Sequence, residues 1–283
     1  MLGTQRQEAA PAGPLVSAST LEMTQSEFTR IRQLIYQRAG ISLHEGKHAM
    51  VFSRLTRRLK ETGHTSFSEY LNFLESGAGQ AEFEQFTNAL TTNLTAFFRE
   101  EHHFHALHDA LSKWTGPLRL WCCAASTGEE PYSLAMVIAE TLGVRAQARI
   151  VATDIDTQVL ATARSGVYPV NPRGLSAQRM HQFFLKGVRG NEGRMRVKPD
   201  LARMIEFRPF NLISGTWPRG EPFDMIFCRN VMIYFDERTQ REVLRNLHGQ
   251  MKPGGLLFVG HSENFTDATD LFRLRGKTIY ERV

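Results

Sequence analysis

Cysteines and long apolar runs are both scarce in this chain of 283 residues. The cysteines, Cys122, Cys123 and Cys228, lie in apolar stretches and form no Cys-x-x-Cys pair. This pattern favours buried free thiols over a zinc site or a disulfide framework. No apolar run approaches the roughly 20 residues of a membrane-spanning helix, and the first 22 residues lack the hydrophobic segment of an export signal. We therefore expect a cytoplasmic protein that does not insert into a membrane.

Motifs of several well-known catalytic centres are also absent. Four histidines lie between residues 102 and 108, but no His-Glu-x-x-His motif accompanies them. A packed or solvated helix is therefore favoured over a metal site there, and we expect no bound metal. The small-residue segment at 124–130 lacks Gly-x-Gly-x-x-Gly, so a dinucleotide site is a weak interpretation.

The composition is that of a folded globular chain with a basic excess. Hydrophobic residues make up 42% and charged residues 22%, an ordinary balance. The net charge of +5 predicts an acidic partner surface, without deciding between nucleic acid and protein. Residues 1–22 are rich in Ala, Pro, Gly and Ser, which predicts a flexible tail.

Residues 23–92 have helical periodicity throughout. The first predicted helix opens with a capping box formed by Thr24 and Glu27, and a third opens with a second box formed by Ser66 and Glu69. These patterns predict a small all-helical domain. We expect residues 93–116 to form a linker and a connecting helix.

From residue 117 to the end, short apolar runs alternate with helical segments. This rhythm predicts an α/β domain over 117–283, built on a doubly wound, mostly parallel sheet. The alternation is interrupted at about 168–203 by a helical segment and a Gly-rich, basic one. We interpret this interruption as an inserted β-subdomain.

In an open doubly wound sheet, ligands bind at the carboxyl ends of the strands. Asp154 and Asp156 follow the second predicted strand. An acidic side chain there can accept hydrogen bonds from two ribose hydroxyls, or Asp154 can simply cap the next helix. Asn211 and Leu212 follow the third strand, where an amide suits the edge of an adenine ring and an apolar side chain suits its face.

Charged side chains follow the first and fourth strands. Glu130 lies in a small-residue segment, where its carboxylate suits a cationic ligand group and disfavours a phosphate. Arg229 and Asn230 follow an apolar run and precede Val231 and Tyr234. Arginine and asparagine are poor candidates for a sheet interior, so a ligand role is plausible.

Polar residues also interrupt the helical rhythm at the junction between the two regions. Asn93 and Thr95 lie there, and Arg99 follows two phenylalanines. A polar segment between domains is a frequent place for a binding site, and an ordinary linker is the alternative.

The second predicted helix carries a group of arginines. Arg54, Arg57 and Arg58 fall close together on its surface. A solvated basic face and a docking surface both remain open from this pattern.

Six separated segments resemble the CheR chemotaxis receptor methyltransferases: LTTNLTAFFREEHHF, AASTGEEPYSLAM, ATDID, FNL, FDMIFCRNVMIYF and KPGGLLFVGHSENF. The resemblance runs from about residue 24 to the end, with the segments in the family's order. It implies a class I fold that uses S-adenosyl-L-methionine (SAM) as methyl donor. The implied acceptor is the γ-carboxylate of receptor glutamates, with methyl esters and S-adenosylhomocysteine as products, in chemotactic adaptation.

By position, the resemblance also implies the roles of individual residues. Arg99 and Tyr234 would lie nearest the methyl-transfer site. The arginines of the second helix would face the cytoplasmic helical domains of transmembrane chemoreceptors, and the β-subdomain would bind a receptor tail peptide. The implied SAM contacts are Asn93, Thr95, Arg99, Glu130, Asp154, Asn211, Leu212, Arg229, Asn230 and Val231.

Two alternatives compete with this interpretation. Methyltransferases that modify amino groups of nucleic acids commonly carry an Asn/Asp-Pro-Pro-aromatic loop, but residues 229–232 contain no proline, so nucleic acid is disfavoured. A non-catalytic adaptor is the second alternative, and the presence of Arg99 and Tyr234 argues against it. No coiled-coil pattern requires a second copy, so we expect a monomer.

Overall fold

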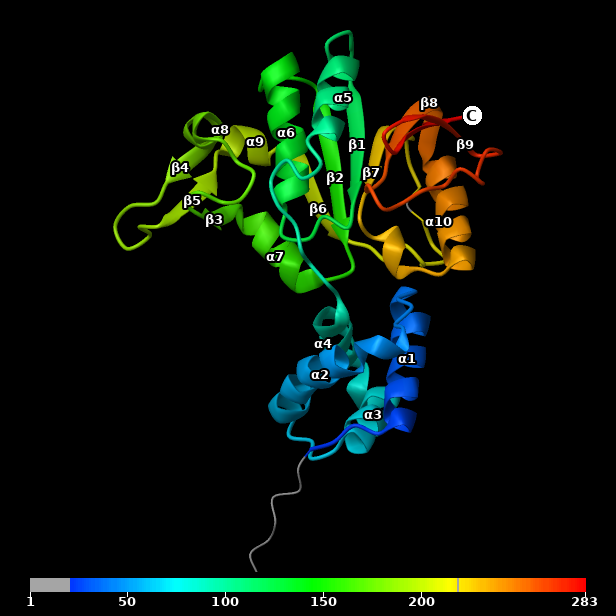
Figure 1. Cartoon of the computed structure of the whole chain (residues 1–283). Coiled ribbons are helices and arrows are strands. Elements are labelled where there is room, and N and C mark those ends of the chain that lie inside the picture. Colours follow the sequence, from blue (N-terminus) through cyan, green and yellow to red (C-terminus); the bar gives the residue numbers. More distant parts are fainter. Residues whose placement is uncertain (1–20, 218) are drawn as a thin grey trace, which may run out of the picture.

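The computed structural model describes residues 21–217 and 219–283. Residues 1–20, most of the predicted flexible tail, lie outside the described residues. Figure 1 shows a helical domain below and a larger sheet domain above, joined by the segment between α4 and α5. None of the helices in the described ranges has the length and apolar character needed to cross a membrane.

The lower domain is built from helices whose starts follow local sequence signals. Thr24 and Glu27 form the predicted capping box. At the third helix, the Glu69 N–H donates to Ser66 Oγ, but the Glu69 carboxylate accepts from the N–H and hydroxyl of Thr65, so the second predicted box is only half formed. The helices are α1 (Gln25–Ala39), α2 (His48–Thr62), α3 (Phe67–Glu75) and α4 (Gln80–Leu90).

The upper domain is organised around a seven-stranded sheet with the order β6-β2-β1-β7-β8-β10-β9. Its first five strands run parallel, whereas β10 pairs antiparallel with both β8 and β9. The predicted mostly parallel sheet is therefore confirmed. The strands are β1 (Leu118–Cys123), β2 (Ala148–Asp154), β6 (Ile205–Pro209), β7 (Phe223–Cys228), β8 (Met251–Phe258), β9 (Phe272–Gly276) and β10 (Ile279–Arg282).

Helices cover both faces of this sheet, as a doubly wound fold requires. Alternate side chains of β1 point to opposite faces: Leu120 and Cys122 pack with residues of α5 and α6, whereas Trp121 and Cys123 pack with residues of α10. All three cysteines are buried free thiols, as predicted. The covering helices are α5 (His102–Leu111), α6 (Glu129–Leu142), α7 (Thr157–Ser165) and α10 (Glu237–Gln250).

The predicted β-subdomain is present as a separate three-stranded antiparallel sheet. In Figure 1 it projects from the side of the sheet domain. It contains β3 (Val167–Pro169), α8 (Ala177–Phe183), β4 (Phe184–Lys186), β5 (Arg194–Val197) and α9 (Pro199–Ala202).

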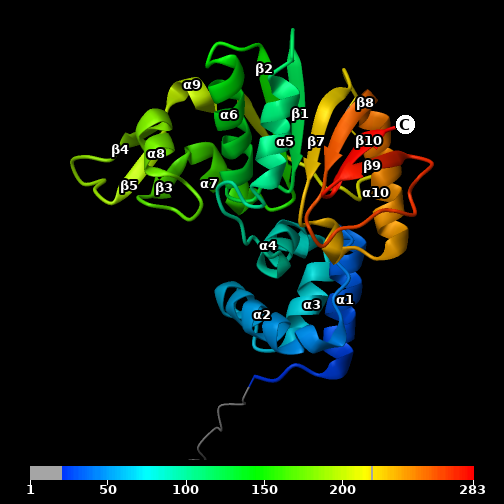
Figure 2. The ribbon, with the colours of Figure 1, turned by 45° about the horizontal axis from the view of Figure 1, so that its top comes forward.

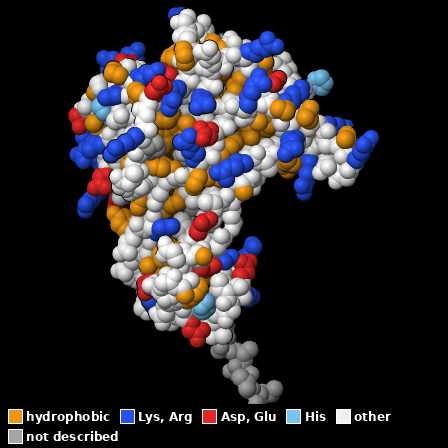
Figure 3. Space-filling model, turned by 180° about the vertical axis from the view of Figure 1, so that it is seen from behind, with side chains coloured by type: hydrophobic (Ala, Val, Ile, Leu, Met, Phe, Trp, Pro, Cys, Tyr) orange, Lys and Arg blue, Asp and Glu red, His pale blue; other side chains and the backbone are white. Residues whose placement is uncertain are grey.

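The helical domain lies against the carboxyl ends of the parallel strands, as Figure 2 shows. The Ser42 N–H donates to the carbonyl of Tyr234 at 2.8 Å, and Asn211 Nδ2 donates to the carbonyl of Arg38 at 2.7 Å. Seen from behind in Figure 3, lysine and arginine side chains are spread over the sheet domain and its projecting lobe. The edge of the sheet where ligands bind in this fold thus faces a second domain.

Candidate functional site

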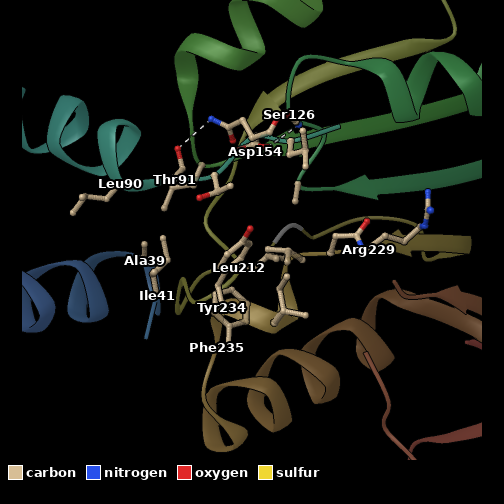
Figure 4. Close-up of a pocket in the computed structure, with 18 of the residues that line it drawn as sticks. Ala39, Ile41, Leu90, Thr91, Ser126, Asp154, Leu212, Arg229, Tyr234 and Phe235 are labelled. Carbon is tan, nitrogen blue, oxygen red and sulfur yellow. Dashed lines mark hydrogen bonds between the residues drawn. The ribbon is translucent and has the colours of Figure 1, made fainter. Parts of the chain in front are cut away.

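A cavity of about 350 Å³ lies between the two domains, at the carboxyl ends of β1, β2 and β7. Ala39 and Ile41 contribute to it from the helical domain, and Leu212 and Phe235 from the sheet domain (Figure 4). Every predicted site residue outside α2 lines this cavity: Asn93, Thr95, Arg99, Glu130, Asp154, Asn211, Leu212, Arg229, Asn230, Val231 and Tyr234.

Asp154 ends β2 with its carboxylate held in one orientation. It is 6% exposed, and it accepts hydrogen bonds from the backbone N–H groups of Ser126 at 2.8 Å and Asp156 at 2.9 Å. Burial raises the pKa of Asp154 to about 6, although both N–H groups oppose this increase. Asp156, not Asp154, caps α7, so the simple capping interpretation of Asp154 is wrong.

The junction segment is fastened to the loops that follow β1 and β2. Asn93 Nδ2 donates to Asp156 at 2.8 Å and to the Thr91 hydroxyl at 3.2 Å, and Thr91 in turn donates to Asp156 at 2.9 Å. The Ser126 hydroxyl donates to the carbonyl of Asn93 at 3.1 Å. These bonds fix the segment that carries Arg99 relative to the sheet.

Arg229 is the centre of a buried ionic network at the end of β7. Its side chain is fully buried and pairs with Glu130 and with Glu100, the latter at 3.1 Å. It also donates to the backbone carbonyl of Arg99. Arg99 Nε lies 4.0 Å from the same Glu100, so the network joins two guanidiniums to two carboxylates. Of these carboxylates, Glu130 lines the cavity, where it suits a cationic ligand group.

Glu100 belongs to this network, although the sequence analysis missed it. It also accepts a hydrogen bond from Asn230 Nδ2 at 3.1 Å, and His261 Nδ1 lies 3.0 Å from it. Burial alone would raise the pKa of Glu100, but the His261 hydrogen bond and the Arg229 charge outweigh it and lower this pKa to about 2. No sequence pattern distinguishes Glu100 from the exposed Glu101 beside it.

Glu263 is a second functional candidate that sequence reasoning missed. Its carboxylate is 3% exposed and accepts backbone N–H bonds from Gly260, Asn230 at 2.9 Å, Met232 at 2.7 Å and Ile233 at 3.4 Å. Burial raises the pKa of Glu263, and these N–H groups partly offset the increase. This carboxylate holds the loop between β7 and α10. It follows β8, so the rule that identified Asp154 could have found it.

The two residues expected nearest the reaction lie on different loops of the same cavity. Arg99 Nη1 donates to the carbonyl of Leu94 at 3.0 Å, and the Arg99 side chain is 34% exposed. Tyr234 is half-buried, and its backbone is tied to the helical domain through Ser42. The Arg99 guanidinium and the Tyr234 backbone are therefore each held by a hydrogen bond, and both residues line the cavity.

The arginines of α2 do not form the common surface that the sequence predicted. Arg54 donates to carbonyls at the end of α4, and Arg58 forms a two-pronged pair with the largely buried Glu82 of α4. Arg57 is 82% exposed. The difference arises because Arg54 and Arg58, one helical turn apart, face the neighbouring α4, whereas Arg57 faces solvent.

The histidines of α5 serve packing in part. His103 is fully buried, and its Nε2 lies 3.0 Å from the Thr278 hydroxyl. Burial lowers the pKa of His103 to about 4. Within residues 21–217 and 219–283, no group of three or more His, Cys, Asp or Glu side chains could hold a metal ion.

Comparison with known proteins assigns both domains to one family. The family described as "CheR methyltransferase, all-alpha domain" matches residues 26–91, and "CheR methyltransferase, SAM binding domain" matches residues 93–280. The chain is 50% identical to the chemotaxis protein methyltransferase of Escherichia coli (strain K12) over 262 residues, 92% of each chain. It is 45% identical to chemotaxis protein methyltransferase 2 of Pseudomonas aeruginosa over 272 residues, 94% of this chain and 96% of the relative.

Proposed function

Because this chain belongs to the CheR family of chemotaxis protein methyltransferases, which use SAM to methylate chemoreceptor glutamates, we propose that its inter-domain cavity is the site of methyl transfer. The observation that carries the proposal is the convergence of the predicted site residues. They come from separate segments of the chain, yet all of them outside α2 line a single cavity. A buried carboxylate, Asp154, lies at the cavity wall.

The lining has the chemistry that SAM requires. The Asp154 carboxylate suits the two ribose hydroxyls, and Leu212 with Asn211 suits the adenine ring. The Glu130 carboxylate, which lines the cavity, suits the amino group of the methionine part. When bound, SAM supplies a methyl group on a positively charged sulfur.

The acceptor needs no general base from this chain. A glutamate side chain has a reference pKa of about 4.3 and is already ionised at neutral pH. Methyl transfer cancels the carboxylate charge against the sulfonium charge, so a cavity that excludes water favours the reaction. The main contribution of the protein is then alignment, which supplies roughly 7–11 kcal/mol in favourable intramolecular systems.

Arg99 and Tyr234 are the residues proposed to align the acceptor. Arg99, anchored at the Leu94 carbonyl, steers the carboxylate into the cavity by charge. Tyr234 fixes its approach through a hydrogen bond from the phenol hydroxyl. A close, two-pronged arginine pair would reduce the nucleophilicity of the carboxylate, so the Arg99 contact is partial or passes through water.

Kinetics with saturating SAM test these two roles. We expect Arg99→Ala and Tyr234→Phe to lower turnover by about 10²-fold, the scale of losing one transition-state contact or of misplacing the acceptor. Arg149→Ala is the matched control, because Arg149 is an exposed arginine that does not line this cavity. Unchanged turnover in both site variants would show that Arg99 and Tyr234 do not align the acceptor.

The finer contacts with the receptor belong to the same proposal. Among the arginines of α2, we assign the docking role to Arg57, because its side chain is 82% exposed and pairs with Glu61 on the same helix, whereas Arg54 and Arg58 are bonded to α4. A receptor tail peptide would add to an edge strand of the β-subdomain, where β3 and β4 form the two edges. The proposed working form is a monomer in the cytoplasm.

A further inference from the structure

Two exposed apolar side chains lie at the cavity. Leu94 is 75% exposed and Ile233 is 49% exposed, and both contribute to the cavity lining. Neither belongs to any of the hydrophobic clusters found among the described residues. Their burial therefore contributes little to the stability of the fold, and their apolar surface is available to a partner.

Each of these side chains is held beside a residue proposed to act on the acceptor. The carbonyl of Leu94 accepts the hydrogen bond from Arg99 at 3.0 Å. Ile233 directly precedes Tyr234, and its N–H faces the Glu263 carboxylate at 3.4 Å. Leu94 and Ile233 thus lie on two separately fixed loops that line the same cavity.

The geometry of a helical substrate connects these observations. Residues three and four positions from a helical glutamate share its face, at about 5–6 Å between Cβ atoms. A glutamate that extends into the cavity therefore brings those neighbouring positions to the cavity rim. A charged neighbour would lose water against Leu94 and Ile233, whereas a small or apolar neighbour would not.

We propose that Leu94 and Ile233 form an apolar rim that contacts the receptor helix one turn from the substrate glutamate and selects glutamates with small or apolar neighbours there. This inference rests on the proposed function, because it requires the receptor glutamate to enter the inter-domain cavity. The Arg99 guanidinium, which lines the same cavity and is 34% exposed, provides the charge complement for the glutamate itself. The rim adds selectivity that a charge contact alone does not provide, since every glutamate carries the same charge.

Methylation kinetics with full-length receptor in membranes test the rim. Leu94→Ser and Ile233→Ser are each expected to raise the KM for receptor about five- to tenfold, the scale of losing one half-buried aliphatic contact. Turnover at saturating receptor and the affinity for S-adenosylhomocysteine, measured by calorimetry, should stay within about twofold. Leu274→Ser is the matched control, because Leu274 is 48% exposed on β9 and does not line the cavity.

A receptor variant tests the selectivity directly. A lysine placed one helical turn from a methylated glutamate should slow methylation by the unmodified enzyme, and the Leu94→Ser/Ile233→Ser double variant should lose most of this discrimination. Unchanged KM and unchanged discrimination in an active enzyme would overturn the rim alone. A loss of S-adenosylhomocysteine affinity with normal receptor KM would also overturn it, because the side chains would then serve the donor. An unmodified enzyme that transfers no methyl group to receptor would overturn the proposed function as well.

Discussion

Lowering the pH from 7 to 5 should weaken SAM binding, because the Asp154 carboxyl takes up a proton in this range. Burial raises the pKa of Asp154 from its ordinary value of 3.8 to about 6. The ionised carboxylate can accept hydrogen bonds from both ribose hydroxyls, whereas the protonated carboxyl has one acceptor fewer. SAM is therefore expected to bind the ionised form in preference.

The size of the change in SAM affinity follows from this pKa, and its direction follows from the linkage between ligand binding and proton binding. Ribose hydroxyls that bind the carboxylate lower the pKa of Asp154 in the complex, so the affinity is full above pH 6 and decreases as the pH falls below it. Hydrogen bonds to a charged group are worth about 1.5–3 kcal/mol each. Two such bonds lower the pKa of Asp154 in the complex enough for the carboxylate to stay ionised at pH 5, so the affinity continues to fall down to that pH. With a pKa of about 6, the dissociation constant should rise about tenfold between pH 7 and pH 5.

Folding stability responds to Asp154 in the opposite direction. Between pH 4 and 6 the folded protein binds more protons at this residue than the unfolded chain does. Proton uptake by Asp154 therefore raises the free energy of unfolding of the unliganded protein as the pH falls from 6 to 4. The difference between a pKa of 3.8 and one of about 6 means that the ionised Asp154 lowers the free energy of unfolding by about 3 kcal/mol at neutral pH. Weaker binding at pH 5 would thus not be explained by unfolding through this residue.

Calorimetric titration with S-adenosylhomocysteine between pH 5 and 7 measures the effect. Above this range the ligand's own amino group begins to titrate. The matched variant is Asp154→Asn, which is neutral at every pH and should bind weakly with a flat pH dependence. A flat profile in the unmodified protein would show that the ligand does not prefer the ionised form of Asp154. A slope that persists in Asp154→Asn would show that the proton is taken up by a group other than Asp154.

Three further predictions concern buried charges and docking. Glu263→Gln places an amide donor against backbone N–H groups, so we expect a loss of about 1–3 kcal/mol in the free energy of unfolding and weaker SAM binding, measured by denaturant titration and calorimetry. Arg229→Met removes the fully buried charge that pairs with Glu130 and Glu100 and should destabilise the protein by about 3–5 kcal/mol; an unchanged unfolding midpoint would contradict the buried network. Arg57→Ala should raise the KM for receptor a few-fold without changing the affinity for SAM, and equal kinetics would argue against docking at α2.

Much of the site could be predicted because parallel strands gather their carboxyl ends at one edge. Asp154, Asn211 and Asn230 each lie at the carboxyl end of a different strand, so a local pattern of polar residues at the ends of apolar runs was enough to predict that they come together. The capping box at Thr24 and Glu27 is equally local. The β-subdomain was predictable because it interrupts the alternation of strands and helices.

The pairing of buried charges could not be predicted in the same way. Arg229 pairs with Glu130 and Glu100, which lie 99 and 129 residues earlier in the chain. Nothing in the sequence indicates which carboxylates a buried arginine will contact. Whether Arg58 faces Glu82 or solvent likewise depends on how α2 packs on α4. Such pairings are set by tertiary structure. For Arg58, the packing of α2 on α4 places the side chain against Glu82 and not on the surface that the sequence predicted.

The chemical identity of the methyl acceptor can be tested on the unmodified protein. Purified enzyme would be incubated with methyl-labelled SAM and membranes rich in chemoreceptors, and the labelled receptor would then be treated with mild alkali. We predict label on the receptor that is released as methanol, since a glutamate methyl ester hydrolyses under these conditions. Label that resists alkali would place the methyl group on something other than a carboxylate and would contradict glutamate methylation by this protein.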